Sequence, residues 1–170
     1  MNRNSIIEIA FAYPIDEIIR RYAKDHDLPV SAAEEHAAEA KKFLVLCALN
    51  ADKSYAVRGP IDDFWHTFIT FTPRYMDFCE RIAGSYIHHN PSTEERSYDK
   101  YSINRGLRGS AKTEVKFDGM RASYLAMLED YESIFGPPAP LHLWPRPTKS
   151  ESDSGLLGCF PCRCGCRCIA

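Results

Sequence analysis

Hydrophobic and polar positions recur at helical spacing along most of the chain, and this pattern predicts a series of helices. Pro14 suits the first position of a helix, and the isoleucines that follow it share one face with Tyr22. Ser31 and Glu34 have the spacing of a capping box and open an Ala-rich run that continues to about Leu49. We therefore predict two amphipathic helices in this first part of the chain.

Two further helices flank a predicted break near the middle of the chain. Gly59-Pro60 opens the first of them. Thr72-Pro73 matches an N-cap followed by proline at the first helical position, so we expect a new helix to begin there. Gly84 is a signal for the C-terminus of that helix.

The remaining chain predicts loops, a short helix and one long helix. Residues 85–91 are expected to form a loop, and a capping-box pattern from Ser92 predicts a short helix after it. The Gly- and Arg-rich stretch 102–110 predicts irregular structure. Apolar residues at helical spacing then predict a long helix from about Thr113 to Phe135, which a Gly-Pro-Pro sequence ends.

No segment shows a sustained alternation of apolar and polar residues, so we predict an all-α fold: a small bundle of about five to six helices. The length of 170 residues and the 45% hydrophobic content suit one domain with a real core and a tail. We place the helical domain at 1–147, a polar linker at 148–158 and a flexible Cys-rich tail at 159–170.

The charge pattern and the N-terminus narrow the function classes. A net charge of −2 gives no global attraction to nucleic acid or to an anionic membrane. We interpret the basic stretch between Lys100 and Lys116 as a solvated loop, so no nucleic-acid partner is expected. The first apolar run is broken by Glu8 and ends at Pro14, unlike a secretion signal. No stretch approaches the roughly 18–20 apolar residues of a membrane span. We predict a soluble, cytoplasmic protein.

A polar cluster is the main candidate for chemistry. Asp62 and His66 are spaced to share one face of a helix, and His88 and His89 follow about a helix length later. If the chain reverses direction at the predicted break, one of the later histidines can approach the first pair. Asp62, His66 and one of His88 or His89 would then offer oxygen and imidazole ligands, which suit a divalent ion such as Zn, Fe or Mn.

A purely structural interpretation of these residues stands beside the metal hypothesis. Asp62 can orient His66 by a hydrogen bond, and the His88-His89 pair can cap the preceding helix by bonding its free carbonyl groups. Three protein ligands with open positions would instead be the usual arrangement of a catalytic metal. A nucleophilic role for Cys79 is disfavoured, because this residue lies on an apolar helical stripe.

The C-terminal tail is rich in thiols, and its cysteines are Cys159, Cys162, Cys164, Cys166 and Cys168. Closely spaced thiolates favour Zn or Cu(I), and the neighbouring arginines favour the thiolate form. Three alternatives stay open. The tail can be lipidated, which would give the protein a membrane partner; it can be a modified peptide; or it can be disordered chain with reactive thiols.

Three groups of residues carry a resemblance to a known family. They are an Asp-x-x-Trp-His start at 62–66, a Thr-x-x-Tyr-x-x-Phe-Cys-Glu middle at 72–80 and a Gly-x-x-x-His-His-x-Pro end at 84–91. With flanking sequence, roughly residues 10–147 resemble the glycine-rich domain-containing protein-like family. The resemblance implies the helical domain and singles out the Asp, Trp and His-His positions, but it implies no reaction. The tail departs from bacterial members because it has little of their Gly repeat.

Three hypotheses for function follow. The first is a metal-associated helical protein that uses both the Asp/His cluster and the tail thiolates. The second is a metal-dependent enzyme of unknown reaction at Asp62, His66, His88 and His89. The third is an interaction module for a protein partner, with a lipidated or modified Cys tail.

Overall fold

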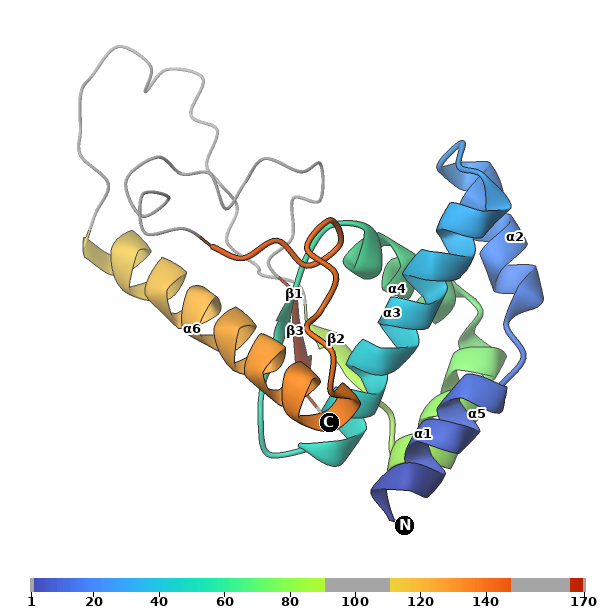
Figure 1. The fold of residues 1–170 in the computed structure, drawn as a ribbon, viewed down its shortest axis with the longest axis horizontal. Helices are drawn as coiled ribbons and strands as arrows, with labels where there is room; N and C mark the ends of the chain where they lie inside the picture. Colours follow the sequence, from blue (N-terminus) through green and yellow to red (C-terminus); the bar gives the residue numbers. More distant parts are fainter. Residues whose placement is uncertain (1, 91–110, 148–165, 170) are drawn as a thin grey trace.

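The computed structural model describes residues 2–90, 111–147 and 166–169, and helices dominate these ranges (Figure 1). The all-α fold class is confirmed. The helices in this part of the chain are α1 (Arg3–Ala12), α2 (Asp16–Asp25), α3 (Val30–Leu49), α4 (Pro60–Thr70), α5 (Thr72–Ala83) and α6 (Ala111–Phe135).

Helix α3 forms the centre of the core. Its four consecutive residues Phe43, Leu44, Val45 and Leu46 are all completely buried. A helix that is buried on every side must be surrounded by other elements. Helix α3 contacts all five other helices, and Figure 1 shows it between α6 on one side and α1, α2 and α5 on the other.

Helix α1 was not predicted. The side chain of Asn2 caps it by accepting a hydrogen bond from the Ser5 amide (2.8 Å). At its other end, the Lys41 ammonium group of α3 donates to the Tyr13 carbonyl oxygen (2.7 Å). Only Ile6 and Ala10 of α1 are buried, so its apolar stripe is too narrow to give a strong periodic signal.

The start of α3 differs from the prediction. The helix begins at Val30 with Pro29 as its N-cap residue, and no side chain bonds the free amides there. Ser31 and Glu34 therefore lie inside the helix, where both are exposed. The predicted capping box was wrong, because a serine and a glutamate three residues apart can equally lie on the exposed side of an ordinary helical turn.

The predicted break between α4 and α5 is confirmed. Phe71 leaves the helical region with φ −83° and ψ 57°. Pro73 follows in the first turn of α5, where its missing N–H costs nothing. Helix α5 ends, as predicted, at Gly84, whose φ of +67° is left-handed.

Three short strands form a small sheet that was not predicted. They are β1 (Ala56–Val57), β2 (His88–Asn90) and β3 (Cys166–Ile169). Strand β3 lies in the middle and pairs antiparallel with both others. The prediction of a loop over 85–91 is thus wrong for β2. Strand β3 lies within the predicted tail. Strands this short cannot display a recognisable alternation, and their partners are distant in sequence.

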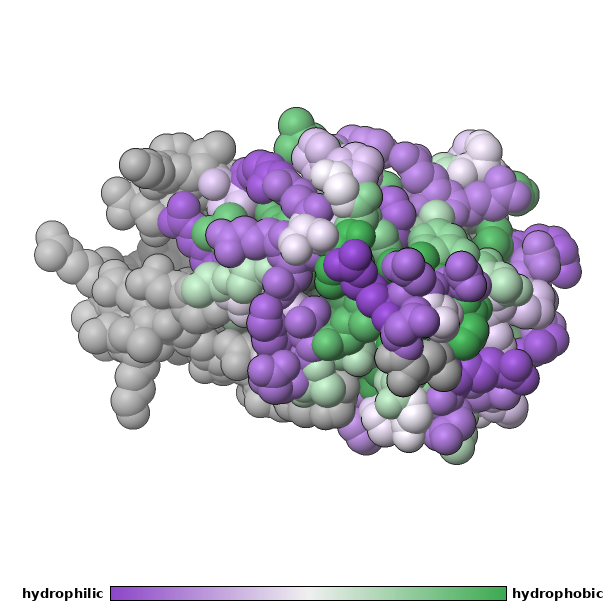
Figure 2. All heavy atoms as spheres, turned by 60° about the horizontal axis from the view of Figure 1, so that its bottom comes forward, coloured by the Kyte–Doolittle hydropathy of each residue, from purple (hydrophilic) through white to green (hydrophobic). Residues whose placement is uncertain are grey.

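Several predicted features lie outside the described residues: the short helix from Ser92, the irregular stretch 102–110, the whole linker 148–158 and Cys159 to Cys164. Among the described residues, no helix combines the length and apolar character that crossing a bilayer requires. Figure 2 shows one face of the molecule, on which hydrophilic side chains cover much of the described surface and hydrophobic ones lie between them.

Candidate metal centre

Asp62 is a completely buried carboxylate in the first turn of α4. Burying a carboxylate is costly unless charged or polar groups surround it. Its Oδ1 lies 2.9 Å from Nε2 of His89, and its Oδ2 lies 3.9 Å from Nδ1 of His66. The two carboxylate oxygens therefore face two different imidazoles.

His66 lies one helical turn after Asp62 on the same face of α4, as predicted. Its side chain is 41% exposed. Its ring packs against the ring of His89, with the centroids 4.3 Å apart. Ligand atoms of Asp62, His66 and His89 all lie within 4.8 Å of one another, an arrangement that can hold a metal ion.

Strand β2 decides which of the adjacent histidines reaches the cluster. Successive side chains of a strand point to opposite faces. The His89 side chain is only 7% exposed and meets Asp62, whereas His88 is exposed and its ring lies 4.9 Å from that of Tyr86. The structure therefore brings His89 to the cluster and leaves His88 outside it.

A buried hydrogen-bond chain positions β2 beside α4. The Tyr75 hydroxyl of α5 accepts from the Trp65 indole nitrogen (2.9 Å) and donates to the Ile87 carbonyl oxygen (2.6 Å). Burial raises the pKa of Tyr75, so this hydroxyl stays protonated and keeps donating. The predicted core position of Trp65 is confirmed, and its ring also lies 4.2 Å from that of His89.

The structure does not show the predicted cap of α5 by His88 and His89. That helix ends through Gly84, whose amide donates to the Glu80 carbonyl oxygen (3.0 Å), and both histidines belong to β2. The other structural interpretation, an Asp62–His66 pair, fits the observed 3.9 Å only as a long-range ion pair.

The spacing of the cluster fits a small divalent ion. Zinc binds imidazole nitrogen and carboxylate oxygen at about 2.0–2.2 Å, so neighbouring ligand atoms of a tetrahedral site lie about 3.4 Å apart. The observed separations of 2.9 Å and 3.9 Å fall on either side of this value. These two separations join different oxygens of Asp62, and the ligand atoms of all three residues lie within 4.8 Å of one another. Side-chain shifts of about 1 Å would therefore produce ligand geometry.

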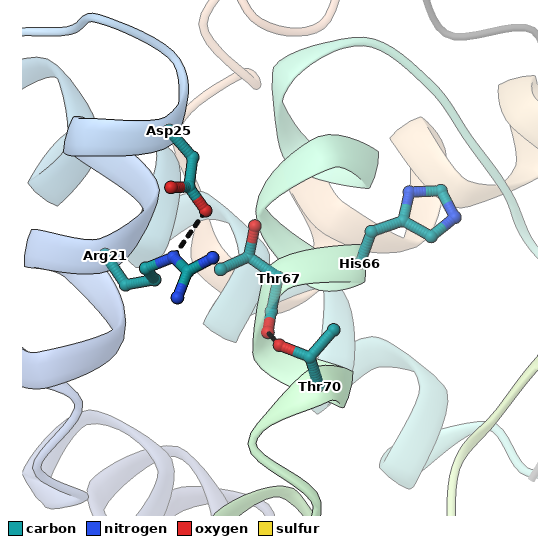
Figure 3. A pocket seen from close by; sticks show the side chains of 5 residues that line it. All are labelled: Arg21, Asp25, His66, Thr67 and Thr70. Atoms are coloured by element: carbon teal, nitrogen blue, oxygen red, sulfur yellow. Dashed lines mark hydrogen bonds and ion pairs between the residues drawn. The ribbon is translucent and has the colours of Figure 1, made fainter.

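A surface pocket of about 430 Å³ adjoins α4 and is lined by Arg21, Asp25, His66, Thr67 and Thr70. Its charged residues pair with each other, since Arg21 Nε lies 2.6 Å from Asp25 Oδ2. Figure 3 shows the His66 ring pointing away from this pair. The Arg21–Asp25 pair of the pocket is therefore not directed at the cluster, although His66 belongs to both.

The two cysteines of the helical domain differ from each other. Cys79 is free and completely buried, and burial raises the pKa of its thiol, which opposes a nucleophilic role. Cys47 is buried as predicted, but it is also disulfide-bonded, which the sequence did not indicate. In the tail, the structure describes the backbone of Cys166 and Cys168 alone among the cysteines. Metal binding by the tail stays a prediction.

One buried carboxylate, that of Glu39, was not predicted from the sequence. Glu39 of α3 is 5% exposed and accepts hydrogen bonds from Lys42 (2.8 Å), Tyr131 (3.0 Å) and Trp144 (2.8 Å). Its three donors come from α3, α6 and the segment after α6. The only local signal was the spacing of Glu39 and Lys42, which is common on exposed helices. We interpret this network as structural.

The fold and cluster define a small all-α protein with a buried carboxylate that faces two imidazoles. The chain belongs to the UCP032817-like family, whose model matches residues 2–133 and so includes the whole cluster. No curated protein and no solved structure matches the chain. The resemblance to the glycine-rich domain-containing protein-like family stays a prediction.

Proposed function

We propose that this protein is a cytoplasmic, metal-associated helical protein that binds one divalent transition-metal ion through Asp62, His66 and His89. Zn²⁺ is the first candidate, followed by Fe²⁺ and Mn²⁺, because one carboxylate and two imidazoles suit these ions. The observation that carries the proposal is the fully buried carboxylate of Asp62, whose oxygens face two imidazole nitrogens.

The energetics of burial support a cation at this position. Asp62 has no exposed surface, and a buried negative charge is stable only when nearby groups compensate it. A divalent metal ion would supply two positive charges beside this carboxylate. The Trp65–Tyr75–Ile87 hydrogen bonds fix the strand that carries His89, which favours metal binding because the ligand needs little reorganisation.

A metal-dependent enzyme is the second candidate function. Three protein ligands leave coordination positions for water or substrate, and the 41% exposure of His66 would give solvent access to them. Within the described part of the chain, no residue arrangement near the cluster indicates a reaction. The third hypothesis, a protein-interaction module with a lipidated tail, concerns a tail of which the structure describes only the backbone of residues 166–169.

The test measures metal binding by the full-length protein. Metal-free protein would be titrated with Zn²⁺, Fe²⁺ and Mn²⁺ by calorimetry, and bound metal would be counted by mass spectrometry. We expect one ion per cluster and at least tenfold weaker binding in Asp62→Asn, His66→Gln and His89→Gln. His88→Gln is the matched control, because it changes an adjacent, exposed histidine outside the cluster, and it should bind like the wild type.

A background with all five tail cysteines replaced by serine separates the cluster from the tail. Metal that persists in this background and disappears on adding His89→Gln would support the internal site. Metal that disappears with the tail cysteines and is insensitive to His66→Gln and His89→Gln would contradict it.

A further inference from the structure

A disulfide links the helical domain to the C-terminal tail. Cys47 of α3 is disulfide-bonded, whereas Cys79, the other cysteine of the helical domain, is free. The remaining five cysteines all belong to the tail at 159–170, so the partner of Cys47 is one of them. Most of the chain lies between the two bonded residues, and the link therefore joins segments that are distant in sequence.

The same tail supplies the central strand of the small sheet. Strand β3 lies between β1 and β2 and pairs with both of them, whereas these two strands are not paired with each other. Among the described elements, the sheet therefore exists only while β3 is in place. Its strands are only two, three and four residues long, and pairings this short are marginally stable on their own.

Strand β2 connects this arrangement to the buried carboxylate of Asp62. It carries His89, whose Nε2 lies 2.9 Å from Asp62 Oδ1. A second restraint comes from α5, where the Tyr75 hydroxyl donates to the Ile87 carbonyl oxygen just before the strand (2.6 Å). Removal of β3 would leave β2 with these two contacts but without the strand it pairs with.

We propose that the Cys47 disulfide is a redox-controlled link that holds β3 in the sheet, and that its reduction releases the C-terminal strand from β1 and β2. A covalent link keeps β3 at a high effective concentration beside its partners, which compensates for the small number of backbone hydrogen bonds. Once the link is broken, the entropy of closing a long loop opposes the pairing. The proposal does not depend on a bound metal.

A dithiol of the thioredoxin class is the reductant whose chemistry fits this link. Its thiolate attacks the sulfur of the tail cysteine, because Cys47 is only 2% exposed and its own sulfur is shielded. Cys47 leaves as a thiolate and takes up a proton. The second thiol of the reductant then resolves the mixed disulfide and releases the tail cysteine as a thiol. Two electrons thus pass from the dithiol to the protein.

The cytoplasmic location that we propose agrees with a switching role for this bond. Cytoplasmic thiols are kept reduced, and the disulfides that form there are typically transient and redox-sensing. The reduced form would present unpaired edges of β1 and β2, because β3 is their common partner. Unpaired strand edges are templates for pairing with another strand, so the oxidation state would control access to these edges.

Peptide mapping of the full-length chain, oxidised with glutathione disulfide, tests the link itself. Free thiols would be blocked with N-ethylmaleimide in acidic denaturant, and the protein would then be digested without reductant. We expect the Cys47 peptide to be joined to a peptide with a tail cysteine, and Cys79 to carry the blocking group. A blocked Cys47, or a bond between Cys47 and Cys79, would overturn the proposal.

Hydrogen exchange measures the release of β3. The amides of β2 and α3 would be followed by mass spectrometry in the oxidised full chain, with and without a phosphine reductant. We expect exchange in β2 to become about tenfold faster or more on reduction, while exchange in α3 stays unchanged. Cys47→Ala should exchange fast at β2 under both conditions. Cys79→Ala is the matched control, because it removes the free buried cysteine, and it should respond to the reductant as the wild type does.

Two results would contradict the release of β3. Slow β2 exchange in the reduced wild type would show that pairing holds the strand without the disulfide. Fast β2 exchange already in the oxidised wild type would show that the disulfide does not hold it. If Cys47→Ala loses the protection of α3 as well, the variant is unfolded, and the comparison of oxidised and reduced wild type decides.

Discussion

Gly84 ends α5 with a backbone conformation that other residues avoid. Its φ is +67°, and a Cβ atom added there would meet nothing within 4 Å. Gly84→Ala should therefore destabilise the protein by about 1 kcal/mol through backbone strain alone. Urea unfolding measures this loss. Gly84→Asn is the matched control and should lose less, because asparagine tolerates the left-handed region; equal losses would argue against a conformational origin.

His36 gives the stability a pH dependence that is independent of the Asp62/His66/His89 cluster. Its Nδ1 lies 3.0 Å from the Tyr22 hydroxyl, and burial is the main cause that lowers its pKa below 6.5, against the opposing charges of Glu35 and Asp63. As pH falls below 6.5, the unfolded chain takes up a proton that the folded state still excludes. Stability should therefore fall from pH 6.5 down to the lowered folded pKa.

His36→Gln keeps a polar side chain beside Tyr22 and removes this titration. The free energy of unfolding in urea, measured against pH, should show a smaller acid loss in the variant than in the wild type. The difference between the two proteins should be constant above pH 6.5 and should change only below it. Parallel curves over the whole range would show that His36 does not contribute.

Between elements, the Glu39 carboxylate joins α3 to α6 and to Trp144. Glu39→Ala would leave the buried Trp144 indole and Tyr131 hydroxyl without their acceptor, so we expect a loss of about 3 kcal/mol or more. Chemical denaturation measures it. Glu35→Ala is the matched control: Glu35 lies one turn earlier, is exposed and bonds only the exposed His142, so its loss should stay within about 1 kcal/mol.

The elements that the sequence predicted well are those with local chemical signals. Pro73 marks the start of α5 because proline has no amide hydrogen to donate to a preceding turn. Gly84 marks its end because glycine, which has no side chain, tolerates a left-handed backbone. Helix α1 lacks such signals, since its cap is Asn2 and only Ile6 and Ala10 are buried. Its existence depends on packing against α3 and α5, which lie elsewhere in the chain.

The candidate site shows the same limit of local information. The spacing of Asp62 and His66 predicted their shared face, because a helix sets it. The choice of His89 over His88 depends on a strand whose pairing partner lies at residues 166–169. The burial of Glu39 and its role as a shared hydrogen-bond acceptor could not be predicted, because its donors Tyr131 and Trp144 are distant in sequence.

Across the whole molecule, metal binding and folding should be coupled. Asp62 and His66 come from α4 and His89 from β2, so the proposed ligands meet only in the folded chain. An ion that binds the folded state alone stabilises it by about 2.7 kcal/mol at a concentration one hundred times its dissociation constant. Zn²⁺ should therefore raise the unfolding free energy of the full chain, and a chelator should reverse the effect.

Variants of the adjacent histidines test this coupling in one background. His89→Gln removes a ligand that is 7% exposed and should abolish the zinc-dependent stabilisation, whereas His88→Gln should retain it. Urea unfolding with and without Zn²⁺ gives the difference for each protein, so any metal-independent cost of the substitution cancels. Equal stabilisation of both variants would place the bound zinc away from Asp62. If the stabilisation is lost in His89→Gln and retained in His88→Gln, the ion links β2 to α4.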